Sequence, residues 1–264
     1  MKGQGVIVVL AGCALAAGCG RAQPSHGAST RAPPDVGAYL PPPELTRAVR
    51  KGGAVQLTGT AAPGASLRLA SPNGAAILAV ADRQGGWSLL APAGDTPRLY
   101  SLSEVTGGQL VRAIGYIAVL PAQGPAAAVL RPASTAILPT GDPERGLTAI
   151  DYDASGAAMA SGRAQPGETI RLYLDGKEAG EDRADDLGVF GGALSRSLTP
   201  GPHILAFAGA RLRGMEAFTA ARGAAVATPP FDSARLAGAW RIDWMTPGGG
   251  VQSTVLFDQK GGRA

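Results

Sequence analysis

The feature of this sequence that most constrains its fold is an internal repeat. Residues 59–69 (GTAAPGASLRL) align with residues 162–172 (GRAQPGETIRL) at an offset of 103 residues. Residues 81–87 (ADRQGGW) align with residues 184–190 (ADDLGVF) at the same offset. Two separated blocks at one offset predict that the chain contains two copies of one structural unit.

Each copy has the pattern of antiparallel strands. Leu67 and Leu69 alternate with polar or small residues, and residues 170–174 repeat that alternation. A period of two with one apolar face predicts a half-buried strand. Asn-Gly at residues 73–74 and Asp-Gly at residues 175–176 favour two-residue hairpin turns. The two turns stand one residue out of step with the 103-residue offset, as if the turn had slipped.

These strands predict an all-β fold of two tandem antiparallel β-sandwiches, because many short strands with Gly/Pro turns and no helical period are typical of that architecture. Trp87 and Phe190 place one large ring at the same point of each copy and are the predicted core anchors. The predicted organisation is a signal peptide at 1–18, a Pro-rich tether at 19–47, a first domain at 48–122, a linker at 123–147, a second domain at 148–228 and a C-terminal hairpin at 229–264 that packs on the second domain.

The N-terminus has the pattern of a secretory signal. Lys2 precedes an apolar stretch at residues 6–17, which is too short to span a bilayer as a mature helix. The sequence LAAGC that ends at Cys19 resembles the lipobox of bacterial lipoproteins, and this resemblance implies that Cys19 is lipidated. The sequence LAGC ending at Cys13 matches that motif more closely but leaves a shorter apolar core. Cleavage near residues 14–16, which would release a soluble secreted protein, is the third alternative.

Residues 20–46 are rich in proline and poor in bulky apolar side chains, so they are predicted to form a disordered, partly polyproline tether. Gly20 stands where bacterial lipoproteins retained in the inner membrane tend to have Asp, which favours the outer membrane, facing the periplasm. The formal net charge of +4 comes without a Lys/Arg cluster, so the sequence predicts no nucleic-acid partner. The predicted partners are the membrane, through the lipid, and peptidoglycan or another envelope protein.

The repeated motif G-x-A-x-P-G-x-[ST]-[LI]-R-L followed by A-D-x-x-G-x-[WF] resembles bacterial immunoglobulin-like (Ig-like) repeats of surface and periplasmic proteins. Residues 171–176 (RLYLDG) and 200–203 (PGPH) are also similar to Ig-like segments of envelope proteins that carry LysM modules. This sequence has no recognisable LysM module, so the resemblance implies an Ig-like fold, and peptidoglycan binding cannot be carried over from it.

The C-terminal segment predicts a hairpin in which Trp240, Ile242 and Trp244 share one face. Two Trp side chains on one face need a surface to cover them. They either complete the second sandwich or, with Tyr173, offer a stacking surface for carbohydrate or a partner. The first interpretation is favoured.

Candidate chemistry is sparse. Residues 175–186 are rich in acids, and Asp182, Asp185 and Asp186 are the candidate calcium ligands, although a solvated strand edge is the favoured interpretation. Asp151 and Asp153 share a strand face and are a candidate acid–base pair for a hydrolase. His203 is a weak catalytic candidate. With only 2 His and 2 Cys, the sequence predicts no catalytic residue, no cofactor and no metal.

The function predicted from sequence is therefore a lipid-anchored, non-enzymatic binding or scaffolding protein of the cell envelope. A peptidoglycan- or carbohydrate-binding module is the alternative, and a hydrolase is less favoured.

Overall fold

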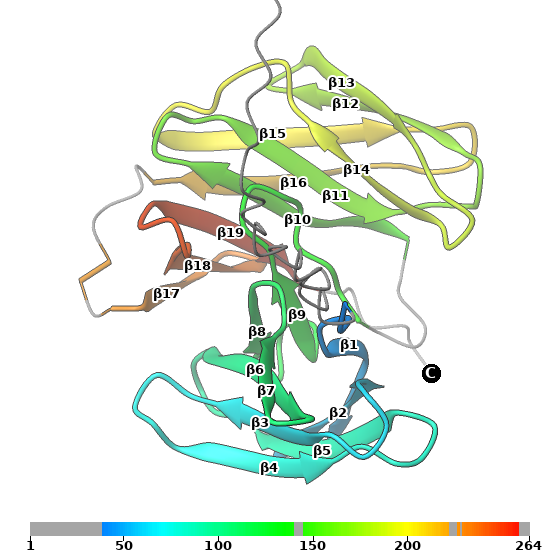
Figure 1. The fold of residues 1–264 in the computed structure, drawn as a ribbon. Coiled ribbons are helices and arrows are strands. Elements are labelled where there is room, and N and C mark those ends of the chain that lie inside the picture. The colour runs from blue at the N-terminus through cyan, green and yellow to red at the C-terminus, as the bar shows by residue number, and fades with distance from the viewer. Residues whose placement is uncertain (1–38, 140–144, 222–225, 228, 259–264) are drawn as a thin grey trace, which may run out of the picture. The chain divides into compact units, whose positions relative to one another are not determined.

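A computed structural model describes residues 39–139, 145–221, 226–227 and 229–258 (Figure 1). The cysteines and the predicted signal and tether up to residue 38 lie outside this range. The described residues form strands and contain no helix, hence none that is long and apolar enough to cross a membrane. All strand pairs are antiparallel, which confirms the all-β prediction.

The first copy of the repeat forms one sandwich of two sheets. One sheet has the order β1-β2-β5 and the other β4-β3-β6-β8-β9, with β7 paired to β6. Its strands are β1 (Glu44–Lys51), β2 (Ala54–Thr60), β3 (Ser66–Ala70), β4 (Ala76–Val80), β5 (Gly86–Pro92), β6 (Arg98–Thr106), β7 (Gln109–Arg112), β8 (Tyr116–Val119) and β9 (Ala127–Leu130).

The second copy forms the other sandwich. One sheet has the order β14-β11-β10-β19-β18-β17 and the other β13-β12-β15-β16. Its strands are β10 (Gly146–Asp153), β11 (Ala158–Arg163), β12 (Thr169–Leu174), β13 (Lys177–Arg183), β14 (Val189–Ala193), β15 (Gly201–Ala208), β16 (Arg213–Ala220), β17 (Phe231–Leu236), β18 (Ala239–Met245) and β19 (Val251–Phe257). The C-terminal strands thus extend a sheet of the second copy, because β19 pairs with β10.

Three strands begin or lie in ranges for which the sequence predicted other structure. β1 begins at Glu44, within the predicted tether, and β10 begins at Gly146, within the predicted linker. β9 lies wholly within that linker. β9 pairs with β8, and an isolated bridge joins Val129 to Ile137. Ala127, Ala128 and Leu130 are fully buried. Small side chains fill core positions here. Because the segment is rich in Ala, its sequence does not show the alternation of bulky apolar and polar residues that would predict a strand.

The large rings of the repeat anchor the two cores. Trp87 is 4% exposed and Phe190 is 1% exposed. Trp87 lies directly across from Gly59, and Phe190 across from Gly162. A Cβ on Gly59 would come within 2.5 Å of the Trp87 ring, and one on Gly162 within 2.3 Å of the Phe190 ring. The repeated glycine therefore leaves the space that each ring fills.

The slipped turn has a structural cause. The β3–β4 pair Ser66↔Val80 and the β12–β13 pair Thr169↔Arg183 stand 103 residues apart in both members. The β12–β13 ladder then shifts register between Leu172 and Tyr173. This bulge adds one residue to β13, so its turn falls one residue out of step with that of the first copy.

Candidate functional site

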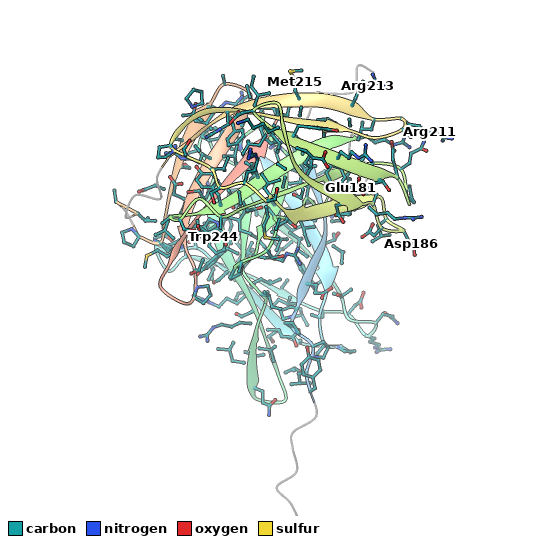
Figure 2. The ribbon with its side chains drawn as sticks, turned by 90° about the horizontal axis from the view of Figure 1, so that it is seen from above. Glu181, Asp186, Arg211, Arg213, Met215 and Trp244 are labelled. Carbon is teal, nitrogen blue, oxygen red and sulfur yellow. The ribbon has the colours of Figure 1, made fainter. Side chains whose placement is uncertain are left out.

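The two C-terminal tryptophans are core residues. Trp244, which is labelled in Figure 2, is 0% exposed. Trp240 is 6% exposed. Trp244 donates a hydrogen bond from Nε1 to Thr254 Oγ1 at 3.1 Å and packs edge-to-face on Tyr116. Tyr173 is half-buried on β12, which belongs to the other sheet of the second copy. The less favoured interpretation, an exposed stacking surface, is therefore wrong for the tryptophans, whose rings pack with apolar side chains of β6 and β9.

The candidate calcium ligands cap turns and strands. Asp182 Oδ2 accepts a hydrogen bond from Gly191 N at 2.6 Å. Asp185 Oδ1 accepts two, from the backbone after it, and Asp186 is exposed (Figure 2). Within the described ranges, no three His, Cys, Asp or Glu side chains are grouped so that they could hold a metal ion. Asp182 and Asp185 thus accept hydrogen bonds from backbone N–H groups of the second copy.

Asp151 and Asp153 lie in different environments. Asp151 is 2% exposed, and its carboxylate accepts hydrogen bonds from Thr254 Oγ1, Gln252 Nε2 and Ala136 N. Burial raises its pKa to about 6, against the opposing effect of these donors. Asp153 is exposed, and the pKa of its carboxyl is lowered chiefly by a hydrogen bond from the Ser155 hydroxyl.

Both aspartates line a hollow of about 300 Å³, but each carboxylate is bonded to its own neighbours. Asp151 holds the backbone that follows β9 against β10 and β19. Gln252 supports it by accepting from Ala133 N and donating to Arg131 O. This network is a structural clamp rather than an acid–base pair poised over a substrate.

His203 also has structural partners. It is 8% exposed, with Nδ1 at 2.7 Å from Asp175 Oδ2 and Nε2 at 2.7 Å from Thr199 O. Burial lowers the pKa of the imidazole, but the bonds to Thr199 and Asp175 outweigh it and the pKa is raised. Both ring nitrogens are engaged, so the histidine fastens a loop to a turn.

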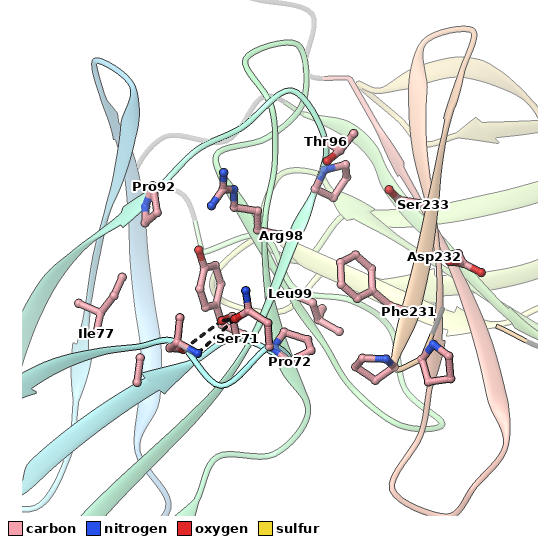
Figure 3. A pocket seen from close by; sticks show the side chains of 17 residues that line it. Ser71, Pro72, Ile77, Pro92, Thr96, Arg98, Leu99, Phe231, Asp232 and Ser233 are labelled. Carbon is pink, nitrogen blue, oxygen red and sulfur yellow. Dashed lines mark hydrogen bonds between the residues drawn. The ribbon is translucent and has the colours of Figure 1, made fainter. Parts of the chain in front are cut away.

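A groove of about 770 Å³ has mainly apolar walls (Figure 3). Ile77 and Pro92 lie on one side of it and Phe231 and Asp232 on the other. Among its lining residues the charged groups are Arg98 and Asp232, and Asp232 already accepts a hydrogen bond from Ala227 N. The groove adjoins the start of β4.

β4 is an uncovered sheet edge. Its sequence, AILAV, has no charged residue, and it ends the sheet order β4-β3-β6-β8-β9. Leu78 is 74% exposed and Val80 is 68% exposed. Edge strands of soluble proteins are usually blunted by charge, proline, a bulge or a covering segment. In the part of the chain that the structure describes, none of these devices is present on β4.

The backbone of β4 offers hydrogen-bonding groups to that open side. Ala81 N donates to Ala65 O and Ser71 N donates to Ala75 O, so the odd-numbered residues of β4 bond to β3. Antiparallel ladders alternate, and the even-numbered residues therefore turn their N–H and C=O groups away from β3. Within the described ranges nothing bonds to these groups. We call them the edge-facing residues: Ala76, Leu78 and Val80.

The outer face of the same sheet exposes several apolar side chains near this edge, with Ser66 and Arg68 between them on β3. Val80, Ser66, Val105 and Leu110 follow one another across β4, β3, β6 and β7. Val105 is 46% exposed and Leu110 is 55% exposed. The β4 edge and these exposed apolar side chains lie on one exposed surface. Exposed apolar side chains grouped in this way often mark protein contacts.

No protein-family model matches this chain, and no curated protein matches it. Among solved structures, it is similar to the central fibronectin-III array of RIM-binding protein, with 10% identity and a TM-score of 0.26. That alignment covers 81% of this chain and 88% of the other. A score this low carries no argument about the function of this chain.

Proposed function

We propose that this chain is a lipid-anchored, non-enzymatic binding or scaffolding protein of the bacterial cell envelope, which contacts protein partners through the β4 edge. The anchor is Cys19, and the site of action is the periplasmic face of the outer membrane. The signal-like N-terminus and the lipobox resemblance support the anchor. The Pro-rich segment would space the sandwiches from the membrane by roughly 25–30 Å if it behaves as a flexible coil.

The observation that carries the proposal is the uncovered, uncharged edge of β4. A strand edge with free N–H and C=O groups binds an additional strand through main-chain hydrogen bonds, and the alternate side chains give specificity. Leu78 and Val80 are exposed beside those groups. The polar candidates elsewhere, such as Asp151 and His203, already have structural partners.

Carbohydrate binding loses its main support because the two tryptophans on which it rested are buried. A hydrolase loses its support because Asp151 and Asp153 are bonded separately. We therefore carry neither forward as a second candidate.

The test of the binding role is site-specific photo-crosslinking of the full chain in intact cells. A photoreactive residue replaces Leu78, and the matched control replaces Glu181, the exposed residue at the equivalent place on β13. We expect a crosslinked polypeptide at position 78 and little at position 181. Equal or absent crosslinking at both positions would overturn the proposal.

Lipidation has its own test. The Cys19→Ser chain is expected to lose incorporation of labelled fatty acid and to leave the membrane fraction. Cys13→Ser is the matched control and should keep the label. A Cys19→Ser chain that keeps it contradicts the anchor.

A further inference from the structure

We propose that the occupant of the β4 edge is a second copy of this chain, paired antiparallel through β4 about a two-fold axis at Leu78. This inference rests on the proposed function, because it names the partner of the same surface. It would join two β4-β3-β6-β8-β9 sheets into one continuous sheet.

The register of the pair follows from the edge-facing residues. An antiparallel pair centred on Leu78 places Ala76 of one copy against Val80 of the other and Leu78 against Leu78. All three pairs then join residues whose N–H and C=O groups already point outward, and each such pair exchanges two hydrogen bonds. The same symmetry makes the interface isologous and closed, so it ends at a dimer.

The side chains agree with this register. Leu78 and Val80 lie on the exposed outer face, so the dimer brings both Leu78 side chains together and Val80 onto Ala76. β4 itself carries no charge that could oppose its copy. Arg68 is the nearest cation on this face, opposite Leu78 on β3.

The charge of Arg68 does not prevent pairing. Two Arg68 residues would stand three strand spacings apart, about 14 Å between their backbones. That separation exceeds the Debye length of about 8 Å at physiological ionic strength, so their repulsion is largely screened. Beyond the ends of β4, Asp82 and Arg83 of one copy approach the uncharged 73–74 turn of the other.

The contact is small, so the dimer should form only where the chain is concentrated. Five residues from each copy make a far smaller interface than the roughly 1,600 Å² of a typical stable complex. We therefore expect monomers in dilute solution. Anchoring two copies in one membrane raises their effective concentration, which lets a weak contact become populated.

The test uses disulfide trapping in the full, membrane-bound chain. The variant Leu78→Cys puts a thiol on the two-fold axis, where the Cα atoms of a hydrogen-bonded pair are about 5.5 Å apart. That distance lies within the range of roughly 4.4–6.8 Å that disulfides span. The matched control is Leu110→Cys, which is exposed on the same sheet face but lies on β7, on the opposite side of β3 and β6 from β4. The parent chain controls for its own cysteines.

We expect mild oxidation to give several-fold more dimer from Leu78→Cys than from Leu110→Cys or the parent chain. The register is tested by co-expressing Ala76→Cys and Val80→Cys chains of different size. These should form the mixed dimer in preference to either self-dimer. Equal dimer yields at positions 78 and 110 indicate random collision and overturn the inference.

The photo-crosslinked product at position 78 separates the two proposals. A second copy of this chain in that product supports both. A different polypeptide as the sole product overturns the dimer and leaves the binding role standing. No crosslink at position 78 overturns both.

Discussion

The two copies of the repeat differ most at equivalent edge strands, β4 and β13. The pair Arg68↔Leu78 on β3–β4 corresponds to Arg171↔Glu181 on β12–β13, since both members differ by 103. Arg171 Nε donates to Glu181 Oε2 at 2.9 Å (Glu181 is labelled in Figure 2). Arg68 faces an exposed leucine instead. The second copy thus has a charged edge where the first has an apolar one.

A covering contact adds to this difference. The bulge in β13 leaves Ala179 O as the acceptor of Ser195 N at 2.7 Å and of Ser195 Oγ at 3.1 Å. The residue equivalent to Ser195 in the first copy is Pro92, 103 residues earlier. Proline has no N–H to donate, so it cannot make the same contact with β4.

A few edge residues decide whether the same fold is closed or open to the addition of a strand. β13 has charge, a bulge and a covering residue, all of which oppose pairing with another strand. β4 has none of them. The motif that makes the two copies alike lies in the core and the turns, and the difference lies at the edge.

The largest expected effect tests the likeness of the two cores. Trp87→Ala and Phe190→Ala should each lower the free energy of unfolding by about 3–5 kcal/mol, because each removes a buried ring and leaves a cavity. Denaturant unfolding of the two variants measures this loss. A loss below about 1 kcal/mol for one of them would show that its ring does not anchor its copy. Leu187→Ala, at a 78% exposed side chain, is the control.

A smaller effect on stability, which depends on pH, comes from Asp151, for which the first copy has no equivalent carboxylate. The pair Asp151↔Met159 corresponds to Val49↔Gln56 in the register of the neighbouring strands. The unfolded carboxyl loses its proton near pH 3.8 and the folded one near pH 6. Between these values the folded state binds more protons, so this group's contribution to stability falls as the pH rises, by about 3 kcal/mol in total.

The measurement is urea unfolding of the natural chain and of Asp151→Asn at intervals from pH 4 to pH 7. The difference in stability between them should shift in favour of Asp151→Asn as the pH rises. If the stabilities of the two proteins changed equally with pH, the raised pKa of Asp151 would be contradicted. Asp153→Asn is the control on the same strand: the pKa of its exposed carboxyl is lowered from 3.8, so its difference in stability from the natural chain should change little between pH 4 and pH 7.

The smallest expected effect comes from a substitution that makes the edge of the second copy resemble that of the first. Ser195→Pro removes the N–H that donates to Ala179 O. Ala179 is 0% exposed. Leaving a buried carbonyl without its donor costs about 1–3 kcal/mol. Ser195→Ala keeps the N–H and loses only the hydroxyl, so its cost should be smaller. Thermal or urea unfolding compares them, and equal stability of both variants would refute the covering role.

Sequence reasoning found the strands of the repeat because their alternation is local. It placed Trp87 and Phe190 in the core for the same reason. It did not find β9, since buried alanines give no periodic signal. It also left the role of Trp244 open, because the surface that covers its ring comes from strands more than a hundred residues earlier.

The acids show the same limit. The sequence grouped Asp182, Asp185 and Asp186 by their closeness along the chain, but hydrogen bonds to nearby backbone engage the first two. It grouped Asp151 with Asp153 by strand period, whereas the approach of Ala136 and Thr254 buries only Asp151. Such partners are distant in sequence or depend on a turn's geometry, so spacing alone could not assign them.

The sequence by itself determined the repeat, its strands and its glycine–ring pairs, because hydrophobic period and turn chemistry act over a few residues. Only the tertiary structure decided which edges are covered. Leu78 and Glu181 occupy equivalent places in the repeat. Whether each edge is open depends on whether another segment bonds to the neighbouring backbone. Ser195 donates to that backbone at β13, whereas Pro92 has no N–H to donate at β4. The exposure of an edge is a property of what packs beside it, and that is settled by the fold.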